Sequence, residues 1–197
     1  IVRFFLFFVA ATFALRAQTS GPVELASPNG ELRFIFNLSP TGVPSYEVLH
    51  RDEPVILASK LGLARNPNST LGGDWKERLK VVATERRTLD STWQQVWGER
   101  ASVRDHANVV DIDLQPVSGN RGTLRLEVRA YDEGIAFRYV FPESLQNQVI
   151  EIGAELTEFT LPVDTLAYWT PSAQRPYEKL PLKNWRSDAE VPLTLEL

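Results

Sequence analysis

Hydrophobic and polar residues alternate one by one along much of the chain. In TLRLEVRAYDEGIAFRYVF (residues 123–141) the first arm separates apolar from charged residues onto opposite sides, with Leu124, Leu126, Val128 and Ala130 facing away from Arg125, Glu127 and Arg129. This period of two predicts a β-strand with one buried face. Because DEG separates two such arms, the segment predicts a hairpin in which Gly134 adopts the positive φ of a tight turn.

The same alternation recurs in shorter runs that are separated by turn signals. ELRFIFNL (31–38) follows SPNG, PSYEVLH (44–50) follows SPTG, and LKVVATERRTL (79–89) follows a glycine-rich connection. After residue 17 no stretch shows a convincing helical face. Many short strands joined by turns are typical of antiparallel sandwiches, in which each sheet has one buried and one solvated face. The sequence therefore predicts an all-β fold.

The beginning of the chain departs from this pattern. Arg3 precedes an apolar run from Phe4 to Leu15, and Ala17 stands before a suitable cleavage point. The run is shorter than the roughly 18–20 apolar residues that span a membrane, so it predicts a secretory signal peptide. We assign residues 1–17 to this peptide and residues 18–197 to an exported domain, which keeps no membrane span after cleavage. An uncleaved anchor is the alternative.

Composition excludes several classes of function. The net charge is −4, with 21 basic and 25 acidic residues well mixed along the chain, so no basic stripe is available for nucleic acid. There is no cysteine, which excludes disulfides and thiolate metal sites. Neither a nucleotide-binding glycine motif nor the G-x-S-x-G of serine hydrolases is present.

Carboxylates and aromatic rings are the remaining candidates for chemistry. Glycoside hydrolysis needs two carboxyl groups across the glycosidic bond, and the candidates are Glu99, Asp105, Glu151 and Glu178. Flat rings that could stack on sugars occur in two groups, which contain Trp93, Trp97, Tyr168, Trp169 and Tyr177. Core packing is the alternative role for each ring and surface solvation for each acid. The residues alone thus predict an exported β-sandwich with aromatic loops.

Three segments carry a resemblance to a known family. SPNGELRFIFNLSPTGVPSYEVLHRDEPVILASKLGL resembles the opening of glycoside hydrolase family 97, a family of exported bacterial α-glycosidases. TWQQVWGERASVRDHANVVDIDL resembles the family's Trp-x-x-Val-Trp-Gly-Glu segment, and RAYDEGIAFRYVFPES resembles its Arg, Asp-Gly and Phe-Arg-Tyr hairpin. The three matches follow in order along nearly the whole chain after the signal peptide.

The resemblance implies the N-terminal part of a larger enzyme. In this family an antiparallel β-super-sandwich, similar to galactose mutarotase, precedes a (β/α)₈ barrel and a small β-domain. The catalytic acid and the base or nucleophile are then expected beyond Leu197, and none in this chain. The implied activity is periplasmic hydrolysis of α-linked oligosaccharides, of α-glucosidase or α-galactosidase type. The sandwich would help to shape the mouth of the active site, with its own barrel as partner.

The resemblance also implies a calcium ion that is bound by glutamates, one of them from the N-terminal domain. In the family this glutamate follows an aromatic-Trp-x-Pro segment, which here reads LAYWTPSAQRPYEKLPL, so Glu178 is the matching position. The alternative role of Glu178 is that of an exposed loop glutamate. Trp169 and Tyr177 of the same segment are weak candidates for substrate contact.

The segment from Asp90 to Leu114 receives a structural interpretation. We expect a strand end and corner at which Trp93 and Trp97 are packed and the charged side chains pair locally, namely Glu99, Arg100, Arg104 and Asp105. A contact with the barrel fits its position in the family's sandwich. His106 is expected to form structural hydrogen bonds.

Two alternatives to the hydrolase interpretation stay open. One is a non-catalytic carbohydrate-binding module, a super-sandwich without a barrel. The other is a mutarotase-like epimerase, in which a histidine and a glutamate act as general acid and base on a sugar ring. Only His50 and His106 could serve in that role, so the second alternative predicts that replacing His106 abolishes turnover.

Overall fold

The structure is a computed structural model that describes residues 21–68, 74–118, 122–141 and 149–196. The predicted signal peptide, residues 1–17, lies outside these ranges. Within them, no helix combines the length and the apolar character that crossing a membrane requires.

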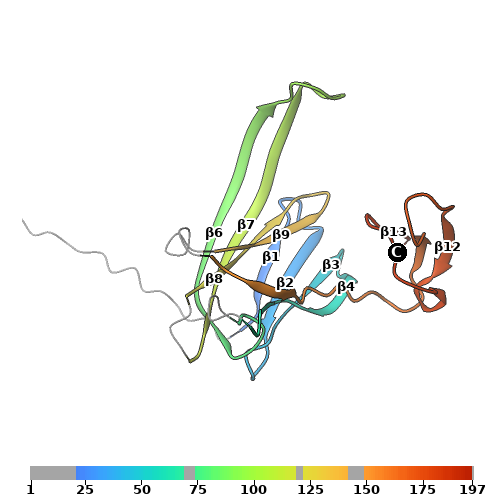
Figure 1. Cartoon of the computed structure of the whole chain (residues 1–197). Helices are drawn as coiled ribbons and strands as arrows, with labels where there is room; N and C mark the ends of the chain where they lie inside the picture. Colours follow the sequence, from blue (N-terminus) through green and yellow to red (C-terminus); the bar gives the residue numbers. More distant parts are fainter. Residues whose placement is uncertain (1–20, 69–73, 119–121, 142–148, 197) are drawn as a thin grey trace, which may run out of the picture.

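Two four-stranded antiparallel sheets form the body of the domain (Figure 1). The first contains β1 (Val23–Ala26), β2 (Leu32–Leu38), β3 (Pro44–His50) and β4 (Glu53–Lys60). The second contains β6 (Leu79–Gln94), β7 (Ser102–Pro116), β8 (Leu124–Ala130) and β9 (Ile135–Val140). In both sheets the strands lie side by side in their order along the chain, each antiparallel to the next.

Two small sheets complete the described fold. β5 (Leu63–Arg65) pairs with β10 (Ile152–Glu155). β11 (Leu166–Trp169) pairs with both β12 (Glu178–Pro181) and β13 (Thr194–Glu196), and a short 3₁₀ helix, η2 (Leu182–Asn184), follows β12. Figure 1 shows this three-stranded sheet to the side of the two larger ones.

The buried faces of the two larger sheets share one hydrophobic core. Phe34 and Tyr46 stack with their ring centroids 5.4 Å apart, and Phe137 of β9 approaches Tyr46 to 5.2 Å, so both sheets contribute. The hydroxyl of Tyr46 donates to the carbonyl oxygen of Glu158 at 2.9 Å, which satisfies the polar end of a buried ring. The four apolar residues that alternate along β8 are all buried. The all-β antiparallel fold predicted from alternation is thus confirmed.

The predicted hairpin between β8 and β9 is confirmed, but the predicted conformation of its glycine is wrong. Gly134 is not among the glycines with positive φ. The N–H of Tyr131 donates to the carbonyl oxygen of Gly134 at 2.8 Å, and the chain bends at Asp132 and Glu133. Gly134 therefore stands after the bend and does not need the left-handed region.

β6 and β7 form a ribbon that extends well beyond the sandwich (Figure 1). They pair from Leu79 opposite Pro116 to Gln94 opposite Ser102. β8 pairs with β7 only over residues 108–114, so the outer part of the ribbon has two strands and no third. We call this outer part, residues 89–107, the arm.

Candidate functional site

The predicted calcium ligand begins β12, directly opposite the predicted sugar-contacting tryptophan of β11. The register pairs Trp169 with Glu178 and Tyr168 with Lys179. Successive residues of a strand point to opposite faces. Ala167 and Trp169 therefore share the buried face of β11, whereas Tyr168 is on the exposed face. The register between β11 and β12 thus places Glu178 beside the indole ring of Trp169.

Glu178 pairs with an arginine that also lies over this ring. Arg186 Nη2 donates to Glu178 Oε2 at 2.7 Å, and Nη1 donates to Oε1 at 3.4 Å. The guanidinium carbon of Arg186 is 5.5 Å from the centroid of the Trp169 ring, within the range of a cation–π contact. We refer to Trp169, Glu178 and Arg186 as the Glu178 cluster.

A second glutamate of the same small sheet makes a comparable set of contacts. Glu196 accepts hydrogen bonds from Lys179 Nζ at 2.7 Å and from the Tyr168 hydroxyl at 2.8 Å. The hydrogen bond from Lys179, and to a lesser extent that from Tyr168, holds the pKa of the Glu196 carboxyl below its ordinary value. Glu196 is therefore a suitable reference for any role claimed for Glu178.

The donor chemistry of the Glu178 cluster fits one ligand of a calcium site but not a complete site. Calcium takes six to eight oxygen ligands, and the carboxylate of Glu178 is hard, charged and 44% exposed. Across the described ranges, no three acidic or histidine side chains gather to hold a metal. The other ligands would have to come from elsewhere, and the role of Glu178 stays a prediction.

The two weak candidates for substrate contact differ in access. Tyr177 is 61% exposed in the loop before β12, whereas Trp169 is buried and Arg186 lies over its ring. Trp169 Nε1 is buried, and the described residues offer it no hydrogen-bond acceptor. Tyr177 presents the open ring of the two, and a sugar contact by either residue stays a prediction.

The other candidate carboxylates lie apart from the Glu178 cluster. Asp105, on the arm, is 3.7 Å from the guanidinium of Arg129. Glu151 accepts a hydrogen bond from Asn66 Nδ2 at 3.3 Å. Glu99 is exposed in the turn that joins β6 and β7. The expectation that the catalytic acid and the base or nucleophile lie outside this chain stays a prediction.

The predicted packing of Trp93 and Trp97 is wrong. Their exposed fractions are 52% and 87%, because both lie at the end of the arm, where neither a third strand nor a second sheet is present to cover them. Local pairing of Arg104 is confirmed, but its partner is Asp90, which accepts from Nε and Nη2 at 2.7 Å each.

The two histidines occur in different sheets. His106, on the arm, is opposite Asp90 in the β6–β7 register. His50 ends β3, with its Nε2 3.9 Å from a carboxylate oxygen of Glu31, which is also paired with Arg51. His106 therefore lies opposite a carboxylate that Arg104 already binds, and the epimerase alternative stays a prediction.

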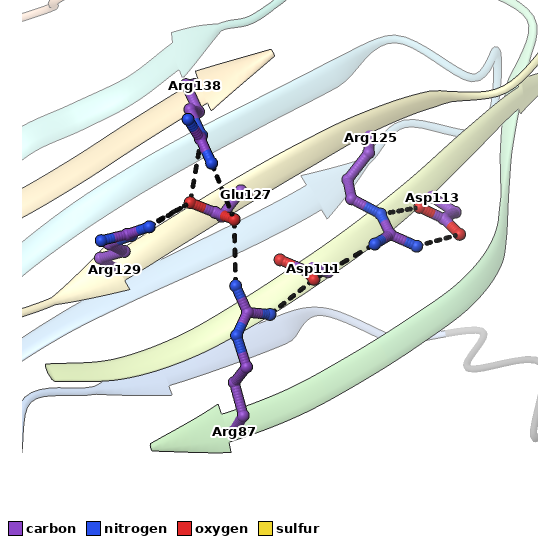
Figure 2. Close-up of polar contacts among 7 residues, drawn as sticks. All are labelled: Arg87, Asp111, Asp113, Arg125, Glu127, Arg129 and Arg138. Atoms are coloured by element: carbon purple, nitrogen blue, oxygen red, sulfur yellow. Dashed lines mark hydrogen bonds and ion pairs between the residues drawn. The ribbon is translucent and has the colours of Figure 1, made fainter. Parts of the chain in front are cut away.

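The sequence reasoning missed a network of arginines and carboxylates on the outer face of the second sheet (Figure 2). Glu127 accepts hydrogen bonds from Arg87 at 3.0 Å, Arg129 at 3.0 Å and Arg138 at 3.1 Å. Asp111 accepts from Arg87 at 2.6 Å and from Arg125 at 3.3 Å, and Arg125 also holds Asp113. We call these seven residues the arginine ladder.

The arginine ladder is a network of charges in which the carboxylates are mostly buried. Asp111 and Glu127 are only 5% and 7% exposed, beneath guanidinium groups that already bind them. In the sequence, this network is indicated only by the residues that alternate with the apolar ones. These are acidic on β7 and of both charges on β8. Four strands must be in the correct register before these charges meet, and single-strand periodicity does not supply that information.

Comparison with known proteins agrees with the fold. The sequence pattern of the family described as Glycosyl-hydrolase 97 N-terminal matches residues 25–197. A retaining alpha-galactosidase of Bacteroides thetaiotaomicron is 24% identical over 166 residues, which are 84% of this chain and 22% of that protein. A probable retaining alpha-galactosidase of Streptomyces bingchenggensis is 27% identical over 161 residues, 82% of this chain and 23% of that protein.

Solved structures give the same result. A glycoside hydrolase family 97 enzyme from Pseudoalteromonas sp. strain K8, solved in complex with panose and with acarbose, superimposes with a TM-score of 0.78 at 27% identity. The superposition covers 88% of this chain and 26% of that enzyme, so this chain spans about a quarter of its length. Because the family pattern extends from residue 25 to residue 197, the chain belongs to the glycosyl-hydrolase 97 N-terminal family.

Proposed function

We propose that this chain is the N-terminal domain of an exported, periplasmic α-glycosidase that hydrolyses α-linked oligosaccharides. The observation that carries the proposal is the family match over residues 25–197, in a chain about a quarter as long as the enzymes it resembles. In this proposal the domain shapes the mouth of the active site in a partner barrel. The catalytic acid and the base or nucleophile then lie outside residues 1–197.

Within that enzyme, we propose that Glu178 supplies one ligand of a calcium ion. Its carboxylate is at the start of a strand and half exposed, so a ligand set from another domain could reach it. A bound calcium ion would supply a fixed divalent charge close to the sugar. Arg186 balances the carboxylate in its absence and would compete with the cation for the same oxygens.

Replacing Glu178 with glutamine in the complete enzyme should weaken calcium binding at least roughly tenfold, because an amide oxygen carries no charge. Calcium binding is measured in two ways: by isothermal titration calorimetry and by the rise in Tm that added calcium causes. Without calcium the Tm should change little, since the Glu178–Arg186 pair is exposed and such pairs contribute at most about 1 kcal/mol.

Glu196→Gln is the matched control for this experiment. It changes the same residue type on the same small sheet, where Glu196 is bound by Lys179 and Tyr168. Its calcium titration should equal that of the unmodified enzyme. An unaltered titration for Glu178→Gln would show that the calcium ligand is another residue.

The chain alone is expected to show no glycosidase activity. In this proposal the catalytic acid and the base or nucleophile belong to the barrel, so the chain by itself lacks them. The assay measures release of nitrophenol from aryl α-glucoside and aryl α-galactoside by residues 18–197. Turnover that survives purification to homogeneity would contradict the proposed division of the enzyme.

A further inference from the structure

The end of the arm carries the two most exposed large apolar side chains of the described residues and a third that is half exposed. Val96 and Trp97 are 88% and 87% exposed, and Trp93 is 52% exposed. The remaining side chains there are polar or charged, namely Gln94, Gln95, Glu99 and Arg100. We call residues 93–100 the arm tip.

The arm tip has a defined backbone. β6 ends at Gln94, and the N–H of Gln95 donates to the carbonyl oxygen of Ala101 at 3.0 Å, so the ribbon stays closed one pair beyond its last strand residues. Gly98 has a φ of 132°, and a Cβ at this position would collide with the side-chain oxygen of Gln95. The positive φ, rather than the contact with the flexible end of Gln95, is the reason that glycine suits this turn beside Trp97.

Both indole rings keep open faces. Within the described part of the chain, neither Trp93 nor Trp97 takes part in a ring–ring or cation–π contact, unlike Trp75 and Trp169. The arm has no third strand, so neither ring can reach the core. An open ring on a stiff support loses little entropy when a ligand stacks on it.

The apolar surface of the arm tip is bordered by polar residues, so by itself it does not make an interface with a separate protein molecule. Towards the sandwich, the next pairs of the ribbon are polar: Thr92 with Arg104, Ser91 with Asp105, and Asp90 with His106. Specific protein interfaces bury at least about 1,000 Å² and have an apolar centre. The apolar side chains of Trp93, Val96 and Trp97 are bordered by these polar pairs, and an apolar surface of this size fits a small ligand.

The chemistry of the border favours a neutral, hydroxyl-rich ligand. The amides of Gln94 and Gln95 both donate and accept hydrogen bonds, as sugar hydroxyls require. Glu99 and Arg100 are adjacent and of opposite sign, so the tip has no net charge that would select an acidic ligand or a lipid surface. A hexose combines an apolar C–H face, which stacks on an indole, with a rim of hydroxyl groups.

We infer that the arm tip is a second carbohydrate site, which binds neutral hexose oligosaccharides on Trp93 and Trp97. The site is separate from the Glu178 cluster and does not depend on the calcium proposal, but it requires that the barrel expected to contact this segment leaves both rings uncovered. It would hold an oligosaccharide at the far end of the ribbon. A surface site of two rings should bind weakly, with a Kd on the order of 1 mM.

The test uses the complete chain and two probes, maltohexaose for glucose units and stachyose for galactose units. Binding is followed by calorimetry and by ligand-observed NMR. Trp97→Leu keeps an apolar side chain but removes the flat ring, and it should weaken binding at least tenfold. Trp97→Phe, which keeps a ring, should weaken it less. Val163→Ala, at a 67% exposed valine outside the arm, should leave it unchanged.

Three results would overturn this inference. The first is no binding of either probe up to about 20 mM, far above the expected Kd. The second is equal binding by Trp97→Leu, because a flat ring would then not be needed. The third is concentration-dependent association of the chain that Trp97→Leu abolishes, measured by sedimentation, because a second copy would then be the occupant. All variants should keep the unmodified Tm, since these side chains are exposed.

Discussion

Replacing Glu127 with glutamine is expected to destabilise the domain by about 3 kcal/mol at neutral pH. The carboxylate is 7% exposed and accepts hydrogen bonds from three arginines, so glutamine would leave their guanidinium groups around a neutral amide. Removing one member of a buried charge network costs much more than the net contribution of an ion pair, because the remaining charges lose their partner. Urea unfolding at pH 7 measures the difference.

Asp90→Asn is the matched control for Glu127→Gln. Asp90 also binds an arginine through two hydrogen bonds, but both side chains are more than half exposed. Exposed pairs contribute at most about 1 kcal/mol, so the loss should be small. Equal losses for the two variants would show that burial of the arginine ladder does not strengthen it.

The effect of Glu127→Gln should also depend on pH. Burial alone would raise the pKa of the Glu127 carboxyl, but hydrogen bonds from Arg138 and Arg129 outweigh it and hold that pKa below its ordinary value. A lowered folded pKa stabilises the fold fully above the unfolded pKa, about 4.3, and this contribution is lost as the pH falls through the folded pKa. The difference between the unmodified chain and the variant should therefore shrink below about pH 4. A constant difference down to pH 2 would contradict this assignment.

Gly42→Ala is expected to be at least as damaging, with a loss of about 3 kcal/mol or more. Gly42 has a φ of 74°, in the turn between β2 and β3, and its carbonyl oxygen accepts the N–H of Leu79 at 3.0 Å. A Cβ here would collide with the backbone N–H of Leu79 and lie 2.6 Å from its carbonyl oxygen. Backbone cannot move aside as a side chain can, so the start of β6 would be pushed from the first sheet.

Gly30→Ala separates the two causes of that loss. Gly30 has nearly the same φ, 77°, but a Cβ there meets no atom within 4 Å. It should therefore cost only the left-handed backbone conformation, about 1–2 kcal/mol. Thermal unfolding of both variants measures the comparison. Similar losses would mean that the contact between Gly42 and Leu79 does not matter.

Period-two alternation was enough to predict the fold class, because each sheet of a sandwich has one buried face. It correctly indicated β2, β3, β8 and β9. Buried residues alternate in β2 and β3, and the apolar residues of β8 are buried at every second position, with Glu127 buried between two of them. It could not predict how far β6 and β7 continue past the sheet. The sequence of residues 89–94 does not show whether a third strand lies beside them. For this reason Trp93 and Trp97, which are exposed, were expected to be packed.

The candidate site was less accessible to sequence reasoning. Glu178 came from the family resemblance, and no local pattern shows that Arg186 folds back eight residues later onto its carboxylate. The arginine ladder depends on the register of four strands. In each case the missing information is a contact between separate segments, and alternation describes only one segment at a time.

The order of the strands also affects how the chain is made. Every neighbour in the two large sheets is the next strand along the chain, so each sheet can close through short loops alone. If the chain emerges from the export channel N-terminus first, the first sheet is complete at Lys60, whereas the second needs Val140 to emerge. Phe34 and Tyr46 would then stay without their covering layer while about 80 further residues emerge. During that interval, we expect the nascent chain to be open to aggregation and to need chaperones.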